Sequence, residues 1–416
     1  MITLGYDIGS SFIKASALDT GTGKILATAV SPDRELKIES PNAGWAEQHP
    51  DVWWQHFKKV TQALLSYPDV ENTAIKAIGI SYQMHGLVTV DKHMKPLRPS
   101  IIWCDSRATS FGEKALNDLG PRKTMNALLN SPGNFTASKL KWVKEYEPNT
   151  FGKISKFMLP GDYIALKLTG HATTTPSGLS EGILWDYEME RPADFLLDYY
   201  DLDSSMIPEI VPNFSRRLKI SAKAAATLGI PKDAAISYRA GDQPNNAFSL
   251  NVLQPGEVAA TAGTSGVVYG VSDTKMTDDK SRINTFLHVN HTSQSPRYGV
   301  LMCLNGTGIL YSWLRHQLAS GMSYEQLNEK AGKISPGAEG VMVFPFGNGA
   351  ERILGNQHPG ASFHHIDFNR HTLGHIVRAA QEGIVFSLQY GMEIMQSGGT
   401  RIKTIRVGKG NMFLSP

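Results

Sequence analysis

Short apolar runs separated by glycine-bearing turns open the chain. Residues 2–6, 12–18 and 24–30 are rich in apolar side chains, and glycines stand in the turns between them. Two tight turns in so short a stretch are typical of antiparallel strands joined in sequence. The pattern therefore predicts a meander of strands at the N-terminus.

The next periodic segment has the spacing of a helix. Its apolar positions recur every three to four residues, at Trp53, Phe57, Val60 and Leu64. We expect this helix to begin at Asp51 and to end at Pro68. Residues 75–80 follow as a short apolar strand, of the kind that is covered on both faces. A strand, a helix and a further strand make a crossover unit, so the pattern favours an α/β architecture.

The middle of the chain is less regular. Residues 87–91 and 101–105 are predicted as further strands, and the proline-rich stretch 110–240 as mixed helix and loop. Its expected helices cover residues 125–129, 139–143 and 162–168. Asp162 stands where a helix N-cap is expected, and residues 173–180 are predicted as a hydroxyl-rich loop. We expect no chemistry from this stretch by itself.

The second half of the chain repeats the opening pattern. Residues 258–271 have the pattern of a strand, a glycine–hydroxyl turn and a second strand. Residues 372–395 form the clearest helix, with one apolar face, and residues 404–407 a last strand. A similar hairpin near the start of each half predicts two similar domains. We place them at residues 1–243 and 244–416.

Length, charge and cysteine content narrow the classes of function. A chain of 416 residues is too long for one ordinary core. With 41 basic against 38 acidic residues and no basic run, nucleic acid is not an expected partner. Cys104 and Cys303 are predicted as reduced thiols without zinc-site spacing. No signal peptide or bilayer-spanning stretch is recognisable, so we expect a cytoplasmic protein without a membrane partner.

The first turn contains the residues of a phosphate site. Asp7 ends a predicted buried strand, Gly9 allows a sharp turn, and Ser10 and Ser11 add hydroxyl groups. Converging N–H and hydroxyl donors can hold phosphate oxygens, and the carboxylate is then left to meet a divalent metal. The alternative is a hairpin turn that binds no ligand.

Polar side chains also follow two other predicted strands. Gln83, Met84 and His85 come after the strand at 75–80, where α/β sheets collect ligands, and they offer the mixture that a polyol needs. For His85 the alternative is a loop histidine that faces water. Asp105 is spaced to pair with Arg107, and either a functional or a structural ion pair is open there.

Asp242 is the candidate general base. It follows Gly241 at the end of a short apolar run, and residues 246–250 could open a helix after it. A carboxylate on such a turn can accept a proton from a bound alcohol as the oxygen attacks. The alternative is that Asp242 only caps a helix.

Taken together, these stretches resemble the FGGY carbohydrate kinases, and within them the xylulokinases. The matching stretches follow the family's order: residues 7–11 with Lys14, 44–48, 83–86, 103–107, 241–242, 263–266 and 349–352. Gln-Met-His-Gly at 83–86 favours xylulokinase over glycerol kinase. The resemblance implies two actin-like ATPase (ribonuclease H-like) domains of α/β class that face a cleft. The two hydroxyl-bearing turns would then grip a polyphosphate from both sides.

The resemblance also implies a reaction and a set of residues. The reaction is ATP-dependent phosphorylation of a ketopentose, most closely D-xylulose at its terminal hydroxyl, with ATP and Mg²⁺ as cofactors. Asp242 would be the general base and Asp7 the acid near the metal. The implied sugar contacts are Gln83, Met84, His85, Trp103 and Asp105. The implied ATP-binding residues are Ser10, Ser11, Lys14, Gly263, Thr264, Asn305, Gly306 and Gly408.

Two departures from the family pattern qualify these expectations. Residues 243–246 stand where the family has small residues, and the expected glycine-rich adenosine loop at 408–411 contains Lys409. The chain also ends at Pro416, where family members continue through helices that complete the second domain. We therefore expect an incomplete second domain, an exposed apolar face on the 372–395 helix, and weak nucleotide binding.

Other functions stay open at this point. The chain could phosphorylate another polyol, such as L-ribulose or gluconate, or it could be a catalytically impaired protein that binds sugar. A chaperone-like ATPase on the same fold would have no use for the loop at 83–86. A homodimer is the default expectation for the oligomeric state.

Overall fold

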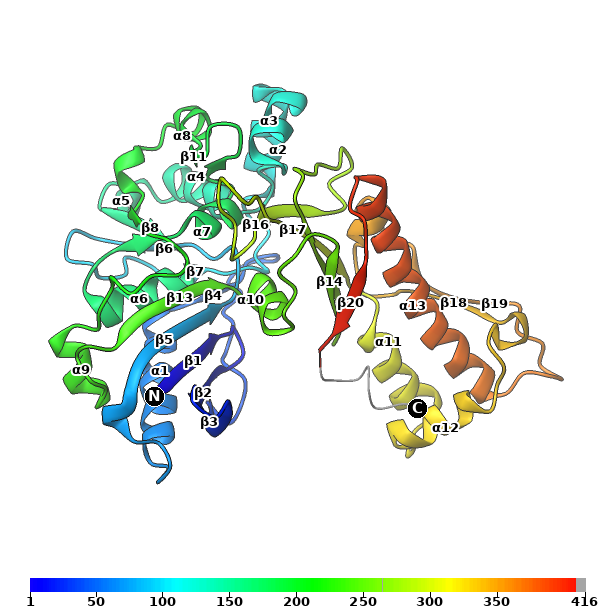
Figure 1. Cartoon of the computed structure of the whole chain (residues 1–416). Helices are drawn as coiled ribbons and strands as arrows, with labels where there is room; N and C mark the ends of the chain where they lie inside the picture. The colour runs from blue at the N-terminus through cyan, green and yellow to red at the C-terminus, as the bar shows by residue number, and fades with distance from the viewer. Residues whose placement is uncertain (264, 409–416) are drawn as a thin grey trace. The chain divides into compact units, whose positions relative to one another are not determined.

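A computed structural model describes residues 1–263 and 265–408 of the chain. The chain divides into two compact units, Met1–Asn245 and Asn246–Pro416 (Figure 1). Each unit is described by itself. Among the described residues, no helix has the length and apolarity needed to cross a membrane.

The first unit contains most of the helices and short strands of the chain. Its strands are β1 (Ile2–Ile8), β2 (Ile13–Asp19), β3 (Lys24–Ser31), β4 (Glu47–Gln48), β5 (Ile75–Tyr82), β6 (Val88–Val90), β7 (Ser100–Ile101), β8 (Lys156–Met158), β9 (Thr173–Thr174), β10 (Trp185–Asp186), β11 (Arg191–Pro192), β12 (Glu209–Ile210) and β13 (Ala235–Gly241). Its helices are α1 (Pro50–Leu65), α2 (Thr109–Leu119), α3 (Pro121–Leu128), α4 (Thr136–Tyr146), α5 (Pro148–Phe151), α6 (Pro160–Thr169), α7 (Pro176–Glu181), α8 (Asp194–Tyr200) and α9 (Ala222–Leu228), and α10 (Asp242–Ser249) starts at its end.

The main sheet of this unit has the strand order β13-β5-β1-β2-β3. β1, β2 and β3 pair antiparallel in sequence, so the predicted meander is confirmed. β5 pairs parallel with β1, and β13 pairs parallel with β5. The carboxyl ends of three strands therefore meet at one edge of the sheet, which is where α/β sheets bind ligands.

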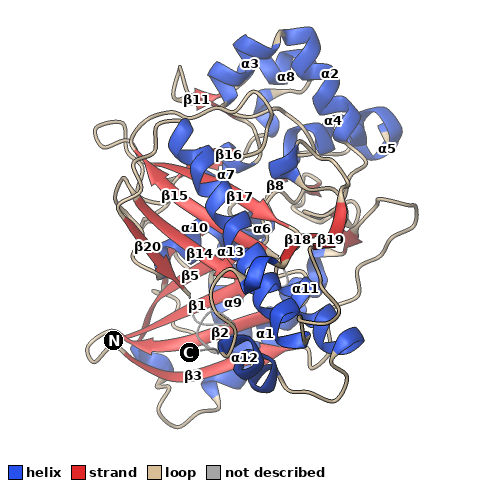
Figure 2. Cartoon of the chain, turned by 90° about the vertical axis from the view of Figure 1, so that its right-hand side faces the viewer, coloured by secondary structure: helices blue, strands red, loops and turns tan. Residues whose placement is uncertain are grey.

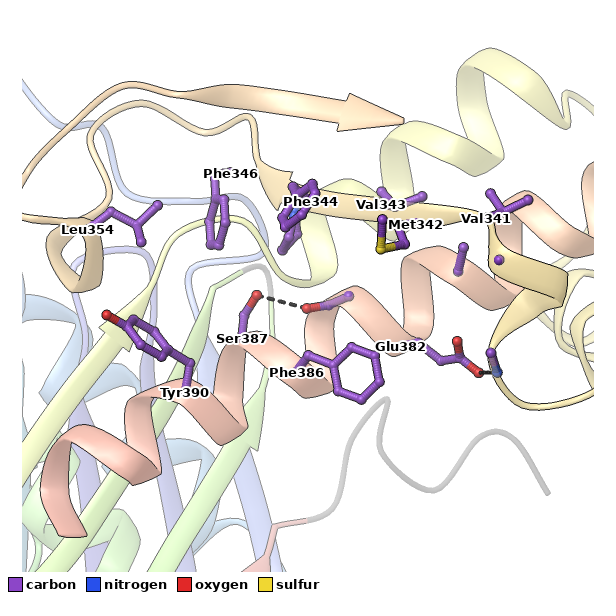
Figure 3. A pocket seen from close by; sticks show the side chains of 15 residues that line it. Val341, Met342, Val343, Phe344, Phe346, Leu354, Glu382, Phe386, Ser387 and Tyr390 are labelled. Atoms are coloured by element: carbon purple, nitrogen blue, oxygen red, sulfur yellow. Dashed lines mark hydrogen bonds between the residues drawn. The ribbon is translucent and has the colours of Figure 1, made fainter. Parts of the chain in front are cut away.

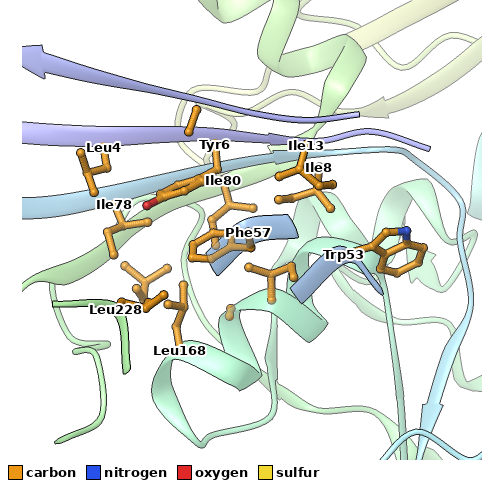
Figure 4. Packing of buried hydrophobic residues seen from close by; sticks show 14 of the residues in the cluster. Leu4, Tyr6, Ile8, Ile13, Trp53, Phe57, Ile78, Ile80, Leu168 and Leu228 are labelled. Atoms are coloured by element: carbon orange, nitrogen blue, oxygen red, sulfur yellow. The ribbon is translucent and has the colours of Figure 1, made fainter. Parts of the chain in front are cut away.

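Alternating apolar residues of β1 build the core of the first unit. Leu4, Tyr6 and Ile8 are buried on the side of the sheet that α1 covers (Figure 4). The Tyr6 ring stacks on Phe57 of α1 at 4.0 Å between centroids. Trp53, Phe57, Val60 and Leu64 are all buried, as the helical spacing predicted. Burial of these side chains from water is the main force that holds α1 on the sheet.

Three local expectations for the first unit are wrong. Residues 173–180, expected as a loop, contain β9 (Thr173–Thr174) and most of α7 (Pro176–Glu181). Asp162 is not a helix N-cap, because α6 already begins at Pro160, a residue suited to the first helical position. From the third position the Asp162 carboxylate accepts the Leu159 N–H at 3.4 Å and pairs with buried Arg239 at 2.7 Å. The strand expected at 101–105 is only β7 (Ser100–Ile101), since the chain turns at Ile102.

The second unit has a sheet that resembles the first in topology. Its strands are β14 (Glu257–Ala262), β15 (Gly266–Ser272), β16 (Asn284–Leu287), β17 (Tyr298–Leu304), β18 (Met342–Phe346), β19 (Gly360–His364) and β20 (Thr404–Val407), and its own helices are α11 (Gly308–Trp313), α12 (Tyr324–Gly332) and α13 (Leu373–Ser397). The sheet has the order β16-β17-β15-β14-β20. β14 pairs antiparallel with β15 and parallel with β20, just as β1 pairs with β2 and β5. The predicted similarity of the two halves is therefore confirmed at the level of strand pairing.

The long helix α13 packs against this second sheet (Figure 2). Leu388, Ile394 and Met395 of the helix share a buried cluster with Val268 and Met302 of the strands. The predicted helix at 372–395 and its apolar face are thus present.

Part of α13 instead borders an apolar groove of about 550 Å³ next to β18 (Figure 3). Phe344 and Phe346 of the strand and Phe386 and Tyr390 of the helix line it. Phe386 is 66% exposed, so the expected exposure of apolar side chains on this helix is observed. Residues 344–346 belong to β18.

Candidate active site

The ends of three parallel strands bring together the polar residues that the sequence singled out in the first unit. In the sheet register Asp7 of β1 lies beside Ser81, and Gly241 of β13 lies beside Tyr82. The backbone N–H of Gln83 donates to the carbonyl oxygen of Ile8 at 3.0 Å. Asp7, Gln83 and Asp242 therefore follow neighbouring strands at the same edge.

Asp242 is a half-buried carboxylate at the first position of α10. This helix begins four residues before the expected start at Asn246. Burial, and then the negative charge of Asp7, raise the pKa of Asp242 from its ordinary 3.8 to about 7. Such a carboxylate gains and loses its proton near neutral pH, as a general base that works near neutral pH must do.

Asp7 is more accessible than Asp242 and has a cationic neighbour. Its Oδ2 lies 3.5 Å from Nζ of Lys14, which stands opposite it on β2. Burial raises the pKa of Asp7, although Lys14 and Ser81 act against this. The described residues contain no cluster of three or more metal-binding side chains. Mg²⁺ is commonly held by one or two carboxylates together with substrate phosphates, so a lone Asp7 fits that donor set.

The turn after β1 is held from several sides. A Cβ atom at Gly9 would lie 2.9 Å from the Phe12 carbonyl oxygen, which explains the glycine. Ser10 accepts two hydrogen bonds, from Gln48 Nε2 to its carbonyl oxygen at 2.6 Å and from Trp103 Nε1 to its Oγ at 3.2 Å. The carbonyl oxygen of Ser11 accepts the Leu36 N–H at 2.8 Å. The turn is therefore a fixed element that joins the predicted phosphate and sugar residues.

The loop at residues 83–86 carries the predicted sugar contacts. Gln83 is only 3% exposed, and neither of its side-chain amide atoms has a hydrogen-bond partner among the described residues. Met84 is buried, and a Cβ atom at Gly241 would lie 2.5 Å from its Cγ. Met84 thus packs beside the residue that precedes Asp242. The unpaired, buried side-chain amide of Gln83 costs free energy unless water or a ligand satisfies it.

Trp103 and Asp105 follow β7 but differ completely in exposure. The Trp103 side chain is 53% exposed. Asp105 is 0% exposed, and both of its carboxylate oxygens accept bonds from Arg107, with the Ala46 N–H adding a bond at 2.6 Å. Of the two alternatives open for this pair, the structure has the ion pair within the protein. A direct sugar contact by Asp105 would require this network to open.

The ion pair belongs to a larger network that accounts for the motif at residues 44–48. Arg107 also donates to Glu47 at 2.7 Å and lies over the Trp45 ring at 3.8 Å. Glu47 in turn accepts a bond from Arg98 at 2.6 Å. The motifs at 44–48 and 103–107 therefore contact each other, and these contacts hold the backbone segment that carries Trp103.

Sequence reasoning missed two buried residues that contact the loop at residues 83–86, called the sugar loop below. Lys139 of α4 is 0% exposed and donates to the His85 carbonyl oxygen at 2.9 Å. Glu181, the last residue of α7, is 2% exposed and accepts the His85 N–H at 3.4 Å. Lys139 could have been noticed, because its position four residues before Val143 places it on the apolar side of a predicted helix. Glu181 lies in the stretch 110–240, from which no chemistry was expected, and no local pattern marks it.

The second unit assembles most of its predicted nucleotide residues. Gly263 follows β14, and Gly408 follows the parallel strand β20, with the Gly408 N–H 3.4 Å from the Ala260 carbonyl oxygen. The Gly308 N–H donates to the Gly263 carbonyl oxygen at 3.1 Å. Thr264 and residues 409–411 of the expected adenosine loop lie outside the described residues.

Asn305 and Gly306 follow β17 and are held in place by the loop after β18. Asn305 donates its N–H to Glu351 Oε2 at 3.0 Å and its Nδ2 group to the Ala350 carbonyl oxygen at 2.6 Å. A Cβ atom at Gly306 would overlap the carbonyl oxygen of Pro345, so only glycine fits. The motif at 349–352 therefore supports the turn at Asn305 and Gly306.

Comparisons with known proteins agree with this arrangement. The N-terminal domain of the FGGY family of carbohydrate kinases matches residues 2–249, and its C-terminal domain matches residues 258–411. Xylulose kinase from Staphylococcus epidermidis is 30% identical over 408 residues, covering 97% of this chain and 79% of that protein. Xylulose kinase from Lactococcus lactis is 28% identical over 407 residues, covering 94% and 76%.

Solved structures share the fold. Xylulose kinase from Rhodospirillum rubrum superposes with a TM-score of 0.88 at 23% identity, covering 99% of this chain and 82% of that one. Gluconate kinase from Lactobacillus acidophilus gives 0.85 at 21% identity, covering 99% and 83%. Together with the family matches, these likenesses establish the expected pair of actin-like ATPase domains as the fold. The chain belongs to the FGGY family of carbohydrate kinases, enzymes that transfer a phosphoryl group to a sugar hydroxyl.

Proposed function

We propose that this kinase phosphorylates a ketopentose, D-xylulose at its terminal hydroxyl, with Asp242 as the general base. One observation carries the proposal: a carboxylate with a pKa of about 7 stands at the same sheet edge as Gln83 and Met84. The relatives named xylulose kinase support the choice of sugar.

The sugar would be oriented by the loop at 83–86 and by Trp103. Hydroxyl groups of the sugar would satisfy the Gln83 amide, whose two side-chain polar atoms are buried without partners among the described residues. His85 would add a polar contact, and Met84 an apolar wall. Trp103, at 53% exposure, offers a surface for the carbon face of the sugar. We now assign Asp105 to positioning Trp103 rather than to the sugar.

Asp242 would accept the proton of the terminal hydroxyl as that oxygen attacks the terminal phosphoryl group of ATP. A new P–O bond to the sugar forms, the bond to the bridging oxygen breaks, and ADP leaves. Placement and charge stabilisation supply most of the catalysis in such reactions. The protein's share is to hold the hydroxyl in line and to keep a base with a matched pKa beside it.

The remaining predicted residues would bind the nucleotide. In the first unit Ser10 and Ser11 offer donors and Lys14 a positive charge, while Asp7 would hold Mg²⁺, which neutralises phosphate charge when bound. In the second unit the proposed ATP contacts are Gly263, Asn305, Gly306 and Gly408, and Thr264 remains a prediction.

Replacement of Asp242 tests the proposed base. In D242N the phosphorylation rate should fall by about 10²- to 10⁴-fold, because no group accepts the hydroxyl proton. The affinity for D-xylulose, measured by calorimetry, should stay within about twofold, since asparagine keeps the size of the side chain. D118N, which removes a charge from the exposed carboxylate of Asp118 on α2, should match the parent chain in both measurements. Full turnover in D242N would contradict the assignment.

A substrate panel distinguishes the alternatives. Each sugar is offered with ATP and Mg²⁺ in an assay that couples ADP release to a colour change. Preference for L-ribulose or gluconate would support a kinase for another polyol. Binding of D-xylulose without ADP release would instead support the catalytically impaired sugar-binding protein. A cytoplasmic location and a homodimer also remain predictions, and sedimentation tests the latter.

A further inference from the structure

His85 has a backbone conformation that its neighbours must maintain. Its φ angle is 60°, in the left-handed region that side chains other than glycine adopt at a cost. Such residues persist where the surrounding structure holds them, and they are frequent at functional sites. The contacts of His85 therefore decide whether the sugar loop keeps its shape.

Two buried ionisable side chains from different helices supply those contacts. Lys139 Nζ donates to the His85 carbonyl oxygen at 2.9 Å, and the His85 N–H donates to Glu181 Oε1 at 3.4 Å. The ring contributes a third bond, between His85 Nδ1 and the Glu181 carbonyl oxygen at 2.9 Å. Because a carbonyl oxygen only accepts, Nδ1 carries the proton. The backbone and the ring orientation of His85 are thus fixed together.

The same two side chains reach the other parts of the site. Lys139 Nζ also donates to the Ile102 carbonyl oxygen at 2.9 Å, one residue before Trp103. The Glu181 carboxylate lies so close to Gly241 that a Cβ atom there would overlap Oε2. Lys139 therefore joins the two backbone segments that carry His85 and Trp103, and Glu181 joins His85 to the residue before Asp242.

Stability alone does not account for an ammonium and a carboxyl at these positions. Burial lowers the pKa of Lys139 to about 7 and raises that of Glu181 well above its usual range, which shows how unfavourable their charged forms are here. A methionine would fill the space of Lys139 without this desolvation cost. What a methionine lacks is the pair of donors that hold two carbonyl oxygens.

We propose that Lys139 and Glu181 form a buried clamp on His85 that sets the affinity and the epimer selectivity of the sugar site. Both are positioning residues, since they act through His85 and the backbone at Ile102 and do not touch the sugar. The proposal rests on the proposed function and adds to it the device that fixes the sugar loop. A loosened loop should accept sugars of different configuration more evenly, because discrimination depends on fixed hydrogen-bonding groups.

The test measures binding, so it does not depend on turnover. Calorimetry gives Kd for D-xylulose and for L-ribulose, a ketopentose of opposite configuration at one carbon. K139M and E181A should raise Kd for D-xylulose by about tenfold and Kd for L-ribulose by less, so that the ratio between the two sugars shrinks. E181Q keeps an oxygen acceptor for the His85 N–H, and its Kd should stay within about twofold of the parent chain.

S138A is the matched control on the same helix. Ser138 is as buried as Lys139, but its hydroxyl bonds Pro132 and Tyr200 and not the sugar loop. This variant should lose some thermal stability and leave both Kd values unchanged. Circular dichroism and melting curves show that each variant is folded.

The outcomes separate the two proposals. If the parent chain binds neither ketopentose, the proposed function fails. If the parent chain binds D-xylulose and K139M and E181A keep both its Kd and the ratio of the two sugars, even with lower melting temperatures, the clamp is overturned. Hydrogen exchange adds a measurement without any variant: the clamp predicts slow exchange of the His85 amide, and exchange at the rate of an open loop would overturn it.

Discussion

The proposed chemistry depends on the ionisation of one residue, Asp242. Burial and the nearby charge of Asp7 both disfavour the carboxylate form and raise its pKa to about 7. Glu181, whose own pKa is raised by burial, faces the same turn. An aspartate at its ordinary pKa would be a much weaker base toward an alcohol. The environment of Asp242 therefore brings its pKa close to neutral pH, where the reaction would run.

This shift predicts a pH profile with a definite sign. A general base works in its deprotonated form, so activity is lost as pH falls through the pKa of Asp242. The value of kcat/KM for the sugar should be level above pH 7 and fall about tenfold per pH unit below it. Initial rates between pH 5.5 and 8.5 measure this, with D242N as the control that lacks the step. A level profile down to pH 5.5 would contradict the assignment.

The placement of candidate site residues was predictable from sequence where a short motif follows an apolar run. Gly9, Ser10, Gln83 and Asp242 stand at strand ends, and strand ends can be located from apolar runs and glycines alone. The pairing of Asp105 with Arg107 was predicted from their spacing, but the burial of the Asp105 carboxylate was not. Its burial depends on Ala46, 59 positions earlier in the chain, and only the folded structure brings the two together.

At the scale of elements, the starts of the two most periodic helices, α1 and α13, were located within one residue. The shorter helices α3 and α4 begin three or four residues before the expected ranges, and capping details were missed. α1 starts at Pro50, one residue before the expected Asp51. The start of α6 was misplaced because a carboxylate at the N-cap or at the third helical position gives a similar sequence signal. The ion pair of Asp162 with the distant Arg239 could not be read from the local sequence. β7 was overestimated because its apolar residues extend beyond the point where the backbone turns at Ile102.

The turn between β17 and α11 gives a prediction for one element. G306A should lower ATP affinity at least about tenfold, since the new Cβ atom would overlap the Pro345 carbonyl oxygen and displace Asn305. D-xylulose affinity should be unchanged, because the proposed sugar contacts belong to the first unit. G332A is the control: Gly332 of α12 has open space where a Cβ atom would stand, so alanine should be neutral or slightly stabilising. Calorimetry with ATP and Mg²⁺ compares the two variants.

At the scale of the whole molecule, each unit contributes one hairpin turn to the proposed reaction. The first strand of each main sheet pairs antiparallel with the second and parallel with a later one, and each hairpin turn follows that first strand. Internal repetition in the sequence predicted this duplication, because both hairpins carry glycine and hydroxyl residues. The chain spans 79% of the length of the Staphylococcus epidermidis relative, and both family domains are represented.

The proposed mechanism depends on contact between the terminal hydroxyl of the sugar and the Asp242 carboxylate. A crystal structure of the chain with D-xylulose should place the terminal hydroxyl oxygen about 2.6–3.2 Å from a carboxylate oxygen of Asp242. The amide of Gln83 should be hydrogen-bonded to another hydroxyl of the same sugar. D-xylulose bound with its terminal hydroxyl directed away from Asp242, or bound at another surface while the Gln83 amide stays unpaired, would contradict the account.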